Sequence, residues 1–311
     1  MKESENSIQD LNNEIQIESL SEFLNQISIL NKKSKDYLSP SVSSMTYYRG
    51  QSNFEWSLSP KLYRDGLFDQ ESVLISELRR TSPNSFNGLN YFDSLVKMQH
   101  YGLPTRLLDM TLNPLVALYF ACIGDEQKNK DGIVYIFQNL PVFRSSESPI
   151  KIIMKYIFEY SGIGLDIKKF TEDVLTQSNL SSVHHKKHEN ESDLMHTLSK
   201  VPFYAVIPPN NNERIIKQDG AFFVFGMEIN RTKISKNPGT HGKKYINFKP
   251  YSFKTVDEIH NNTHLIRVPS KSKKLIVDEL ALIGISIDKL FPELEYKTEF
   301  VTQLVKRKKF S

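Results

Sequence analysis

Several polar side chains in this sequence stand in otherwise apolar stretches, where a globular fold has little use for them. The earliest is Arg49, between an aromatic residue and a glycine. Others follow at distant positions: His100, Tyr101, Arg106, Asp109 and Gln218. A buried polar group needs a partner. We therefore expect all of these side chains to meet in one pocket.

The residue types around Arg49 suit a phosphate-bearing ligand. A guanidinium group on a strand offers a fixed fork of N–H donors to phosphate oxygens. Gly50 would let a ligand approach the backbone, and Tyr48 or Tyr101 could stack on a flat ring. A structural role fits Arg49 equally well, because it could pair with a core carboxylate such as Asp109 and brace a sheet.

The other polar residues also have structural interpretations. Arg106 and Asp109 alternate poorly across one face of a strand, so we expect one of them to be structural, in a buried pair or a turn cap. His100 ends an amphipathic helix, where a structural role is the more common one. Thr111 is as compatible with helix entry as with a ribose contact.

No metal site is expected from the remaining motifs. His184 and His188 stand at i and i+4, with Glu191 following, a spacing that suits zinc on a helix. That run is so polar that we predict a solvated loop instead. The single cysteine, Cys122, excludes an internal disulfide. Because it lies in an apolar run, we expect a buried, inert thiol.

Helices and strands must alternate irregularly to position these residues. Apolar spacing and capping residues predict helices at about 15–30, 71–80, 90–100, 113–122, 270–283 and 288–290. Short aromatic and β-branched runs predict strands at 45–49, 105–111, 133–137, 203–207, 221–225 and 265–268. Because there is no strict βαβ order, we predict an α+β fold with a central mixed or largely antiparallel sheet.

Composition allows a sizeable core, since 39% of the 311 residues are hydrophobic and 24% are charged. The net charge of +4 is too small to indicate nucleic acid by itself. We expect a disordered segment and an amphipathic helix in 1–40, a main domain in 41–295 with a polar, partly helical insertion at about 140–200, and a basic tail in 296–311. With no signal peptide and no membrane-spanning run, a reducing cytoplasm is the expected compartment.

Two motifs resemble the FRG domain family, which is named after an aromatic-Arg-Gly triplet. The first is Tyr48-Arg49-Gly50-Gln51, and the second runs from Gln99 to Thr111 and continues to Ala121. The sequence departs from the family at Tyr101, where His is frequent, and at Met110, where Trp is frequent. Weaker features follow at Arg214, Gln218, Gly220, Gly284-Ile285 and Leu290-Phe291-Pro292. The resemblance covers roughly residues 45–295 and implies a domain common in bacteria and phages.

The order of parts is also similar to that of ADP-ribosyltransferases with an Arg on the first strand, a hydroxyl residue on a later strand and a catalytic Glu. This similarity implies NAD as co-substrate and nucleic acid or protein as acceptor. The NAD-binding residues would be Tyr48, Arg49, Gly50, Tyr101, Arg106 and Thr111. The catalytic candidates would be His100, Asp109, Glu213 and Gln218. A carboxylate from Asp109, Glu213 or Glu228 would stabilise the oxocarbenium-like ribose that forms when the glycosidic bond breaks.

Three functions remain open from the sequence. The first is an NAD-dependent ADP-ribosyltransferase, acting as a toxin or an antiphage effector. The second is a non-catalytic domain that binds a nucleotide or RNA through Arg49 and Arg106. The third is a protein-interaction module with a structural polar signature. A carboxylate within reach of Arg49 across a cleft would favour the first function. A basic groove with exposed aromatic residues and no such carboxylate would favour the second. Buried and mutually paired Arg49, Arg106 and Asp109 would favour the third.

Overall fold

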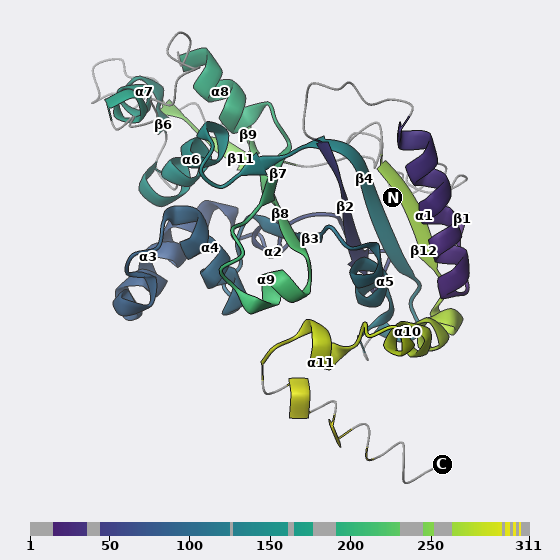
Figure 1. Cartoon of the computed structure of the whole chain (residues 1–311). Coiled ribbons are helices and arrows are strands. Elements are labelled where there is room, and N and C mark those ends of the chain that lie inside the picture. The colour runs from purple at the N-terminus through teal and green to yellow at the C-terminus, as the bar shows by residue number, and fades with distance from the viewer. Residues whose placement is uncertain are drawn as a thin grey trace, which may run out of the picture.

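The fold is built around one large mixed sheet. The computed structural model describes residues 15–35, 44–124, 127–160, 165–176, 191–230, 245–251, 263–293, 296–298, 301–302 and 305. Within them the sheet has eight strands in the order β1-β12-β4-β2-β3-β8-β7-β5 (Figure 1). Neighbouring strands are antiparallel except for the parallel pairs β1–β12 and β5–β7. The predicted α+β class with a mixed, largely antiparallel sheet is confirmed.

The strands of this sheet are β1 (Ile15–Gln16), β2 (Ser44–Gln51), β3 (Leu107–Thr111), β4 (Gly132–Pro141), β5 (Phe143–Arg144), β7 (Phe203–Ile207), β8 (Gly220–Phe225) and β12 (Thr263–Val268). Two small antiparallel pairs lie outside it: β6 (Leu165–Asp166) with β10 (Tyr245–Ile246), and β9 (Met227–Ile229) with β11 (Phe248–Pro250).

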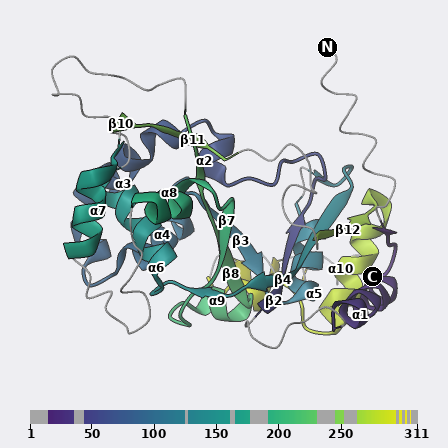
Figure 2. The ribbon, with the colours of Figure 1, turned by 90° about the horizontal axis from the view of Figure 1, so that it is seen from above.

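The helices form two groups at opposite ends of the sheet (Figure 2). The first group packs against β3, β8 and β7. It contains α3 (Glu71–Thr81), α4 (Tyr91–His100), α6 (Ser148–Lys155) with a π-helical turn at Tyr156–Tyr160, α7 (Ile167–Thr176) and α8 (Glu191–Ser199). The second packs against β2, β4 and β12. It contains α1 (Leu20–Lys35), α5 (Pro114–Cys122), α10 (Lys273–Leu282) and α11 (Ile287–Leu290). Two further helices are short: α2 (Lys61–Arg64) and α9 (Glu213–Lys217).

Both helical groups cover the same face of the sheet. Side chains of residues paired across antiparallel strands point to the same face. Tyr48, which packs with the second group, is paired with Thr111, and Asp109 is paired with Phe222, which packs with the first group. The opposite face is apolar and packs against Leu58, with Phe54 and Tyr63 beside it. The helical groups therefore meet along a seam above β2 and β3.

Helix α5 approaches the sheet more closely than a side chain would allow. A Cβ on Gly50 would lie 1.8 Å from the backbone oxygen of Ala117, and a Cβ on Gly132 would lie 2.1 Å from that of Ala121. Asn113 caps the helix through its side chain, which accepts a hydrogen bond from the Leu115 amide at 3.0 Å. The predicted N-cap is confirmed, and glycines on two strands let the helix rest on the sheet.

The predicted helices and strands are confirmed in type, with shifts at their ends. The first helix starts at Leu20 because Ile15–Gln16 pairs with β12 as a strand. Ser270 begins a 3-10 turn that precedes α10 instead of capping it directly. Cys122 is buried, and burial raises the pKa of its thiol to about 12, so it is not a ready nucleophile. Among the described helices, none is long and apolar enough to cross a bilayer.

The stretch at about 140–200 packs differently from the polar insertion that we expected. Its described helices contribute many residues to the apolar core of the first helical group, among them Ile150, Ile153, Ile157, Phe170 and Leu198. Helical spacing places these apolar residues on one side of each helix, while polar residues dominate the composition. His184 and His188 lie outside the described residues, so the predicted solvated loop stays a prediction.

Candidate functional site

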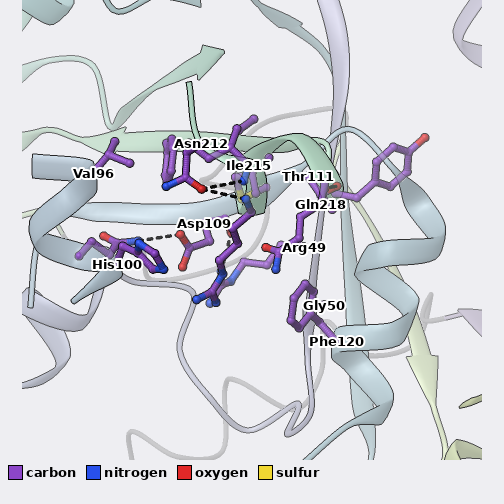
Figure 3. Close-up of a pocket in the computed structure, with 17 residues that line it drawn as sticks. Arg49, Gly50, Val96, His100, Asp109, Thr111, Phe120, Asn212, Ile215 and Gln218 are labelled. Carbon is purple, nitrogen blue, oxygen red and sulfur yellow. Dashed lines mark hydrogen bonds between the residues drawn. The ribbon is translucent and has the colours of Figure 1, made fainter. Parts of the chain in front are cut away.

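A pocket of about 270 Å³ opens at the seam between the two helical groups (Figure 3). Strand β2 pairs with β4 from Ser44 to Gln51 but with β3 at a single position, Tyr48 opposite Thr111. The two strands separate beyond that pair, which leaves room for side chains between them. The pocket is lined by Tyr48, Arg49, Gly50, Val96, Gln99, His100, Asp109, Met110, Thr111, Phe120, Asn212, Arg214, Ile215, Gln218, Gly220, Ala221 and Phe222.

Arg49 reaches into the gap between the separated strands. One of its terminal nitrogens donates to the backbone oxygen of Asp109 at 2.5 Å, in place of a strand-to-strand hydrogen bond. Its Nε is buried and has no hydrogen-bond partner in the part of the chain that the structure describes. Burial lowers the pKa of Arg49, an effect that the Asp109 charge opposes and the Arg64 charge reinforces. Arg49 thus lines the pocket and carries a buried donor without a described partner, a combination that favours a bound anion.

Asp109 presents its carboxylate to the same pocket. It is the exposed residue of an otherwise buried strand. The side-chain amide of Gln99 donates to Asp109 Oδ1 at 2.7 Å. The oxygen of that amide accepts a hydrogen bond from Thr105, so the amide orientation is fixed. Gln99 thus holds the carboxylate in place, no cation of the described residues is bound to it directly, and Figure 3 shows it facing Arg49.

A second guanidinium group comes from the far wall of the pocket. Arg214 stands in the first turn of α9, which Asn212 caps by accepting from the Arg214 amide at 2.8 Å. Its guanidinium carbon lies 4.7 Å from the centre of the Phe291 ring. The guanidinium group makes no hydrogen bond to another described residue, so its N–H donors remain available to a ligand.

Three predicted site residues lie outside the pocket. Arg106 is fully buried and forms an ion pair with Glu71, with its Nε 2.8 Å from Glu71 Oε1. Burial alone would lower the pKa of Arg106, but the Glu71 carboxylate more than offsets this and raises it. Tyr101 is 76% exposed, and Glu213 is exposed on α9. The expectation of one shared pocket is wrong for Arg106 and Tyr101, and correct for Arg49, His100, Asp109 and Gln218.

Some pocket residues hold the fold together through their polar atoms. The Thr111 hydroxyl donates to the backbone oxygen of Gln218 at 2.6 Å and accepts from the Asn113 amide at 3.0 Å. Gln218 in turn donates to the backbone oxygen of Leu290 at 3.1 Å. Gly50 is required by helix α5, as described above, rather than by a ligand. Glu228, a further carboxylate candidate, pairs with Lys249 at 2.7 Å and lies on β9 away from the pocket lining.

The sequence did not indicate Glu293, whose Oε1 lies 3.0 Å from His100 Nε2. The residues are 193 positions apart. The only sequence signal near it was the weak Leu290-Phe291-Pro292 feature, which ends one residue earlier. The sequence also did not indicate that Asn212 and Val96 line the pocket, because an N-cap residue and an apolar residue on a helix are common in any sequence.

Comparison with known protein families matches residues 44–130 to the FRG domain. The matched segment contains β2, α4, β3 and α5, which carry Arg49, His100, Asp109 and Phe120. Strand β8 and helix α9, which complete the pocket, lie beyond it. No curated protein and no solved structure matches the chain.

Proposed function

Because this chain contains an FRG domain at residues 44–130, we propose that the domain's pocket binds NAD and that the protein is an ADP-ribosyltransferase. A role as a toxin or antiphage effector would rest on that same activity. The observation that carries the proposal is the meeting of Arg49, with an unpartnered buried donor, and the exposed carboxylate of Asp109 in one pocket.

The two arginines suit the pyrophosphate of NAD. Arg49 and Arg214 stand on different walls of the pocket, and both keep N–H donors that no described residue uses. Guanidinium groups bind phosphate oxygens through two parallel hydrogen bonds, a geometry that lysine does not reproduce. A volume of about 270 Å³ is near the lower end for small-molecule sites. We therefore expect the nicotinamide ribose and a phosphate inside and the adenosine at the mouth.

Asp109 would act on the ribose. When the bond from C1′ to the nicotinamide nitrogen breaks, positive charge develops on the ribose ring. A carboxylate that is already oriented stabilises this charge without reorganising. Gln99 provides that orientation for Asp109 through the 2.7 Å hydrogen bond. The interaction-module alternative would be favoured by buried, mutually paired Arg49, Arg106 and Asp109, and the pairing of Arg106 with Glu71 weakens it.

A binding experiment tests the phosphate contacts. Calorimetry on the purified full chain would measure the Kd of NAD, ADP-ribose and nicotinamide. A charge-assisted hydrogen bond contributes about 1.5–3 kcal/mol. Arg49→Ala and Arg214→Ala should therefore each raise the Kd of NAD and of ADP-ribose by roughly 10- to 100-fold. Nicotinamide should be affected far less. Arg80→Ala, which removes an exposed arginine of α3, is the matched control and should leave all three unchanged.

A turnover experiment tests the chemistry. NAD labelled in the adenosine would be incubated with mixed cellular RNA, DNA and protein, and the labelled product followed. Asp109→Asn should bind NAD within a few-fold of the unmutated chain and lose transfer by about 100-fold or more. NAD binding without any labelled product or nicotinamide release would leave the non-catalytic nucleotide-binding function. No binding of NAD or ADP-ribose would refute both.

A further inference from the structure

Residues 286–293, which contain α11, lie behind the pocket and contact residues of its lining. Four lining residues touch them. Gln218 donates to the Leu290 backbone, Arg214 and Phe120 face the Phe291 ring, and His100 meets Glu293. Leu290 and Phe291 are 2% and 5% exposed. The segment is thus anchored in the core of the second helical group, and it holds Glu293 at a fixed place beside the pocket.

The contact between His100 and Glu293 is a directed hydrogen bond. His100 Nε2 and Glu293 Oε1 are 3.0 Å apart, and the two side chains are 27% and 31% exposed. Burial would raise the pKa of Glu293, but its own backbone N–H, the hydrogen bond with His100 and the charge of Arg214 bring it below the ordinary value of 4.5. The carboxylate is therefore ionised at neutral pH, and an ionised carboxylate only accepts hydrogen bonds.

This arrangement decides which ring nitrogen is free. Because Glu293 can only accept, Nε2 of a neutral His100 carries the proton, and Nδ1 keeps its lone pair. Nδ1 has no partner among the residues that the structure describes. His100 lines the pocket from the end of α4, and Asp109 lines it from the neighbouring strand (Figure 3).

We propose that His100 Nδ1 is the proton acceptor for the nucleophile that attacks the ribose, and that Glu293 positions His100 for this task. The inference rests on the proposed function, because it concerns the same pocket. Glu293 acts through His100 and is a positioning residue. An acid side chain that holds an imidazole in one tautomer and stabilises its protonated form is a recurring arrangement in hydrolases.

The C1′–N bond of NAD breaks, and its electron pair goes to the nicotinamide nitrogen, so neutral nicotinamide leaves. The acceptor, a hydroxyl, an amide or water, forms a bond to C1′ through its lone pair. Its proton passes to His100 Nδ1, and the imidazolium is stabilised by Glu293 before the proton is released to solvent. NAD⁺ and the acceptor, which begins with its own proton, thus give ADP-ribosylated acceptor, nicotinamide and H⁺.

Asp109, Arg214 and Tyr101 also lie near His100 or near its partner Glu293. Asp109 is held by Gln99, the residue before His100, and Arg214 contributes its charge to Glu293. Tyr101 packs beside the imidazole with ring centres 5.2 Å apart. Of these, Glu293 alone is hydrogen-bonded to the imidazole, so Glu293 sets its orientation.

The kinetic test follows nicotinamide release and product formation against pH. His100→Asn should lose roughly 100- to 10,000-fold in transfer with NAD affinity within about threefold, and the acid-side fall of the rate should disappear. Glu293→Gln should lose less, and Glu293→Asp should recover part of the loss. Because the two residues act as a unit, Glu293→Gln in the His100→Asn background should cost nothing more. Additive losses, or an unchanged pH profile in His100→Asn, would overturn the proposal.

A spectroscopic test does not depend on turnover. In the full chain with ¹⁵N-labelled histidine, the nitrogen shifts of neutral His100 should report a protonated Nε2 and a bare Nδ1. Glu293→Leu should lose this single tautomer, while Glu228→Leu, which removes a carboxylate away from the pocket, should keep it. A protonated Nδ1, or an unchanged spectrum in Glu293→Leu, would overturn the inference whether or not NAD is consumed. Absence of NAD turnover with the expected tautomer would instead refute the proposed function.

Discussion

Arg49 and Arg106 are the same residue type in one matched domain, and their partners give them different roles. Arg106 has a carboxylate partner, Glu71, and a backbone acceptor at Phe225, and it is fully buried. Arg49 has one backbone acceptor, a buried Nε without a partner among the described residues, and a place in the pocket lining. A buried guanidinium group whose nitrogens all have hydrogen-bond partners is structural, whereas one with an unpartnered nitrogen suits a ligand.

Stability measurements should separate the two arginines. Arg106→Ala leaves the Glu71 carboxylate buried without its partner, and we expect a loss of about 3–5 kcal/mol in the free energy of unfolding. Urea unfolding of the purified variants, followed by circular dichroism, measures this. Arg49→Ala removes one hydrogen bond to a backbone oxygen and should cost only about 1–2 kcal/mol.

A double substitution serves as the control for this ion pair. Arg106→Met with Glu71→Leu removes both charges and keeps apolar volume, so it should be much less harmful than Arg106→Ala alone. If Arg106→Ala unfolded at the same urea concentration as the unmutated chain, the structural role of Arg106 would be wrong.

The sequence identifies the polar residues of the site better than it identifies their partners. Arg49, His100, Asp109 and Gln218 could be predicted to converge because their types are unusual in apolar segments. Whether Arg106 or Asp109 is the structural one could not be decided, since the answer depends on Glu71, which belongs to helix α3 and is an ordinary residue in sequence. Glu293 escaped for the same reason, because its partner is 193 residues away.

Helix α5 connects the matched motif to the sheet, and Gly50 is the residue that allows the contact. Its Cβ position is occupied by backbone atoms of Ala117 and Ala121, at 1.8 and 2.6 Å. The glycine of the aromatic-Arg-Gly triplet is therefore explained by helix packing. Phe120, on the same helix, lines the pocket, so the position of α5 also shapes the site.

Gly50→Ala should destabilise the chain and distort the pocket. A Cβ cannot be accommodated unless α5 moves, and overpacking of this kind costs about 1–3 kcal/mol or more. The measurement is the thermal melting temperature. Gly220→Ala is the matched control, because the nearest atoms to a Cβ added there are 3.3 Å away. We expect the larger loss in Gly50→Ala, together with weaker NAD binding. Equal melting temperatures for both variants would show that α5 moves freely.

Element type and approximate position were predictable from sequence because local signals suffice. The Asn113-Pro114 pair predicts the start of α5, and apolar runs bounded by turn residues predict β4 and β8. Strand order and the separation of β2 from β3 were not predictable, since they depend on contacts between distant segments. The composition of residues 140–200 was misleading for a related reason: buried residues of an amphipathic helix form a minority of its sequence.

At the scale of the whole molecule, the pocket is assembled from parts on both sides of the helical stretch at 140–200. Residues 44–130 supply Arg49, His100 and Asp109, but Arg214 and Gln218 come from a later segment. Strand β3 pairs with β8 along its full length, from Leu107 to Thr111, and with β2 at one position. The matched domain thus depends on β8 to hold β3, and with it Asp109, in place.

The isolated segment 44–130 should therefore fail to fold cooperatively and fail to bind NAD. Without β8, β3 would keep one registered pair to β2, and its apolar residues Leu108 and Met110 would lose contact with Phe223 and the rest of their cluster. Marginal sheets of this kind are not stable in water. The measurement is thermal unfolding by circular dichroism and NAD calorimetry on the segment and on the full chain in parallel. We expect a broad, non-cooperative melt and no binding heat for the segment. A sharp transition with NAD binding like that of the full chain would mean that Arg49 and Asp109 form the site alone, and that Arg214, Gln218 and Glu293 are dispensable walls.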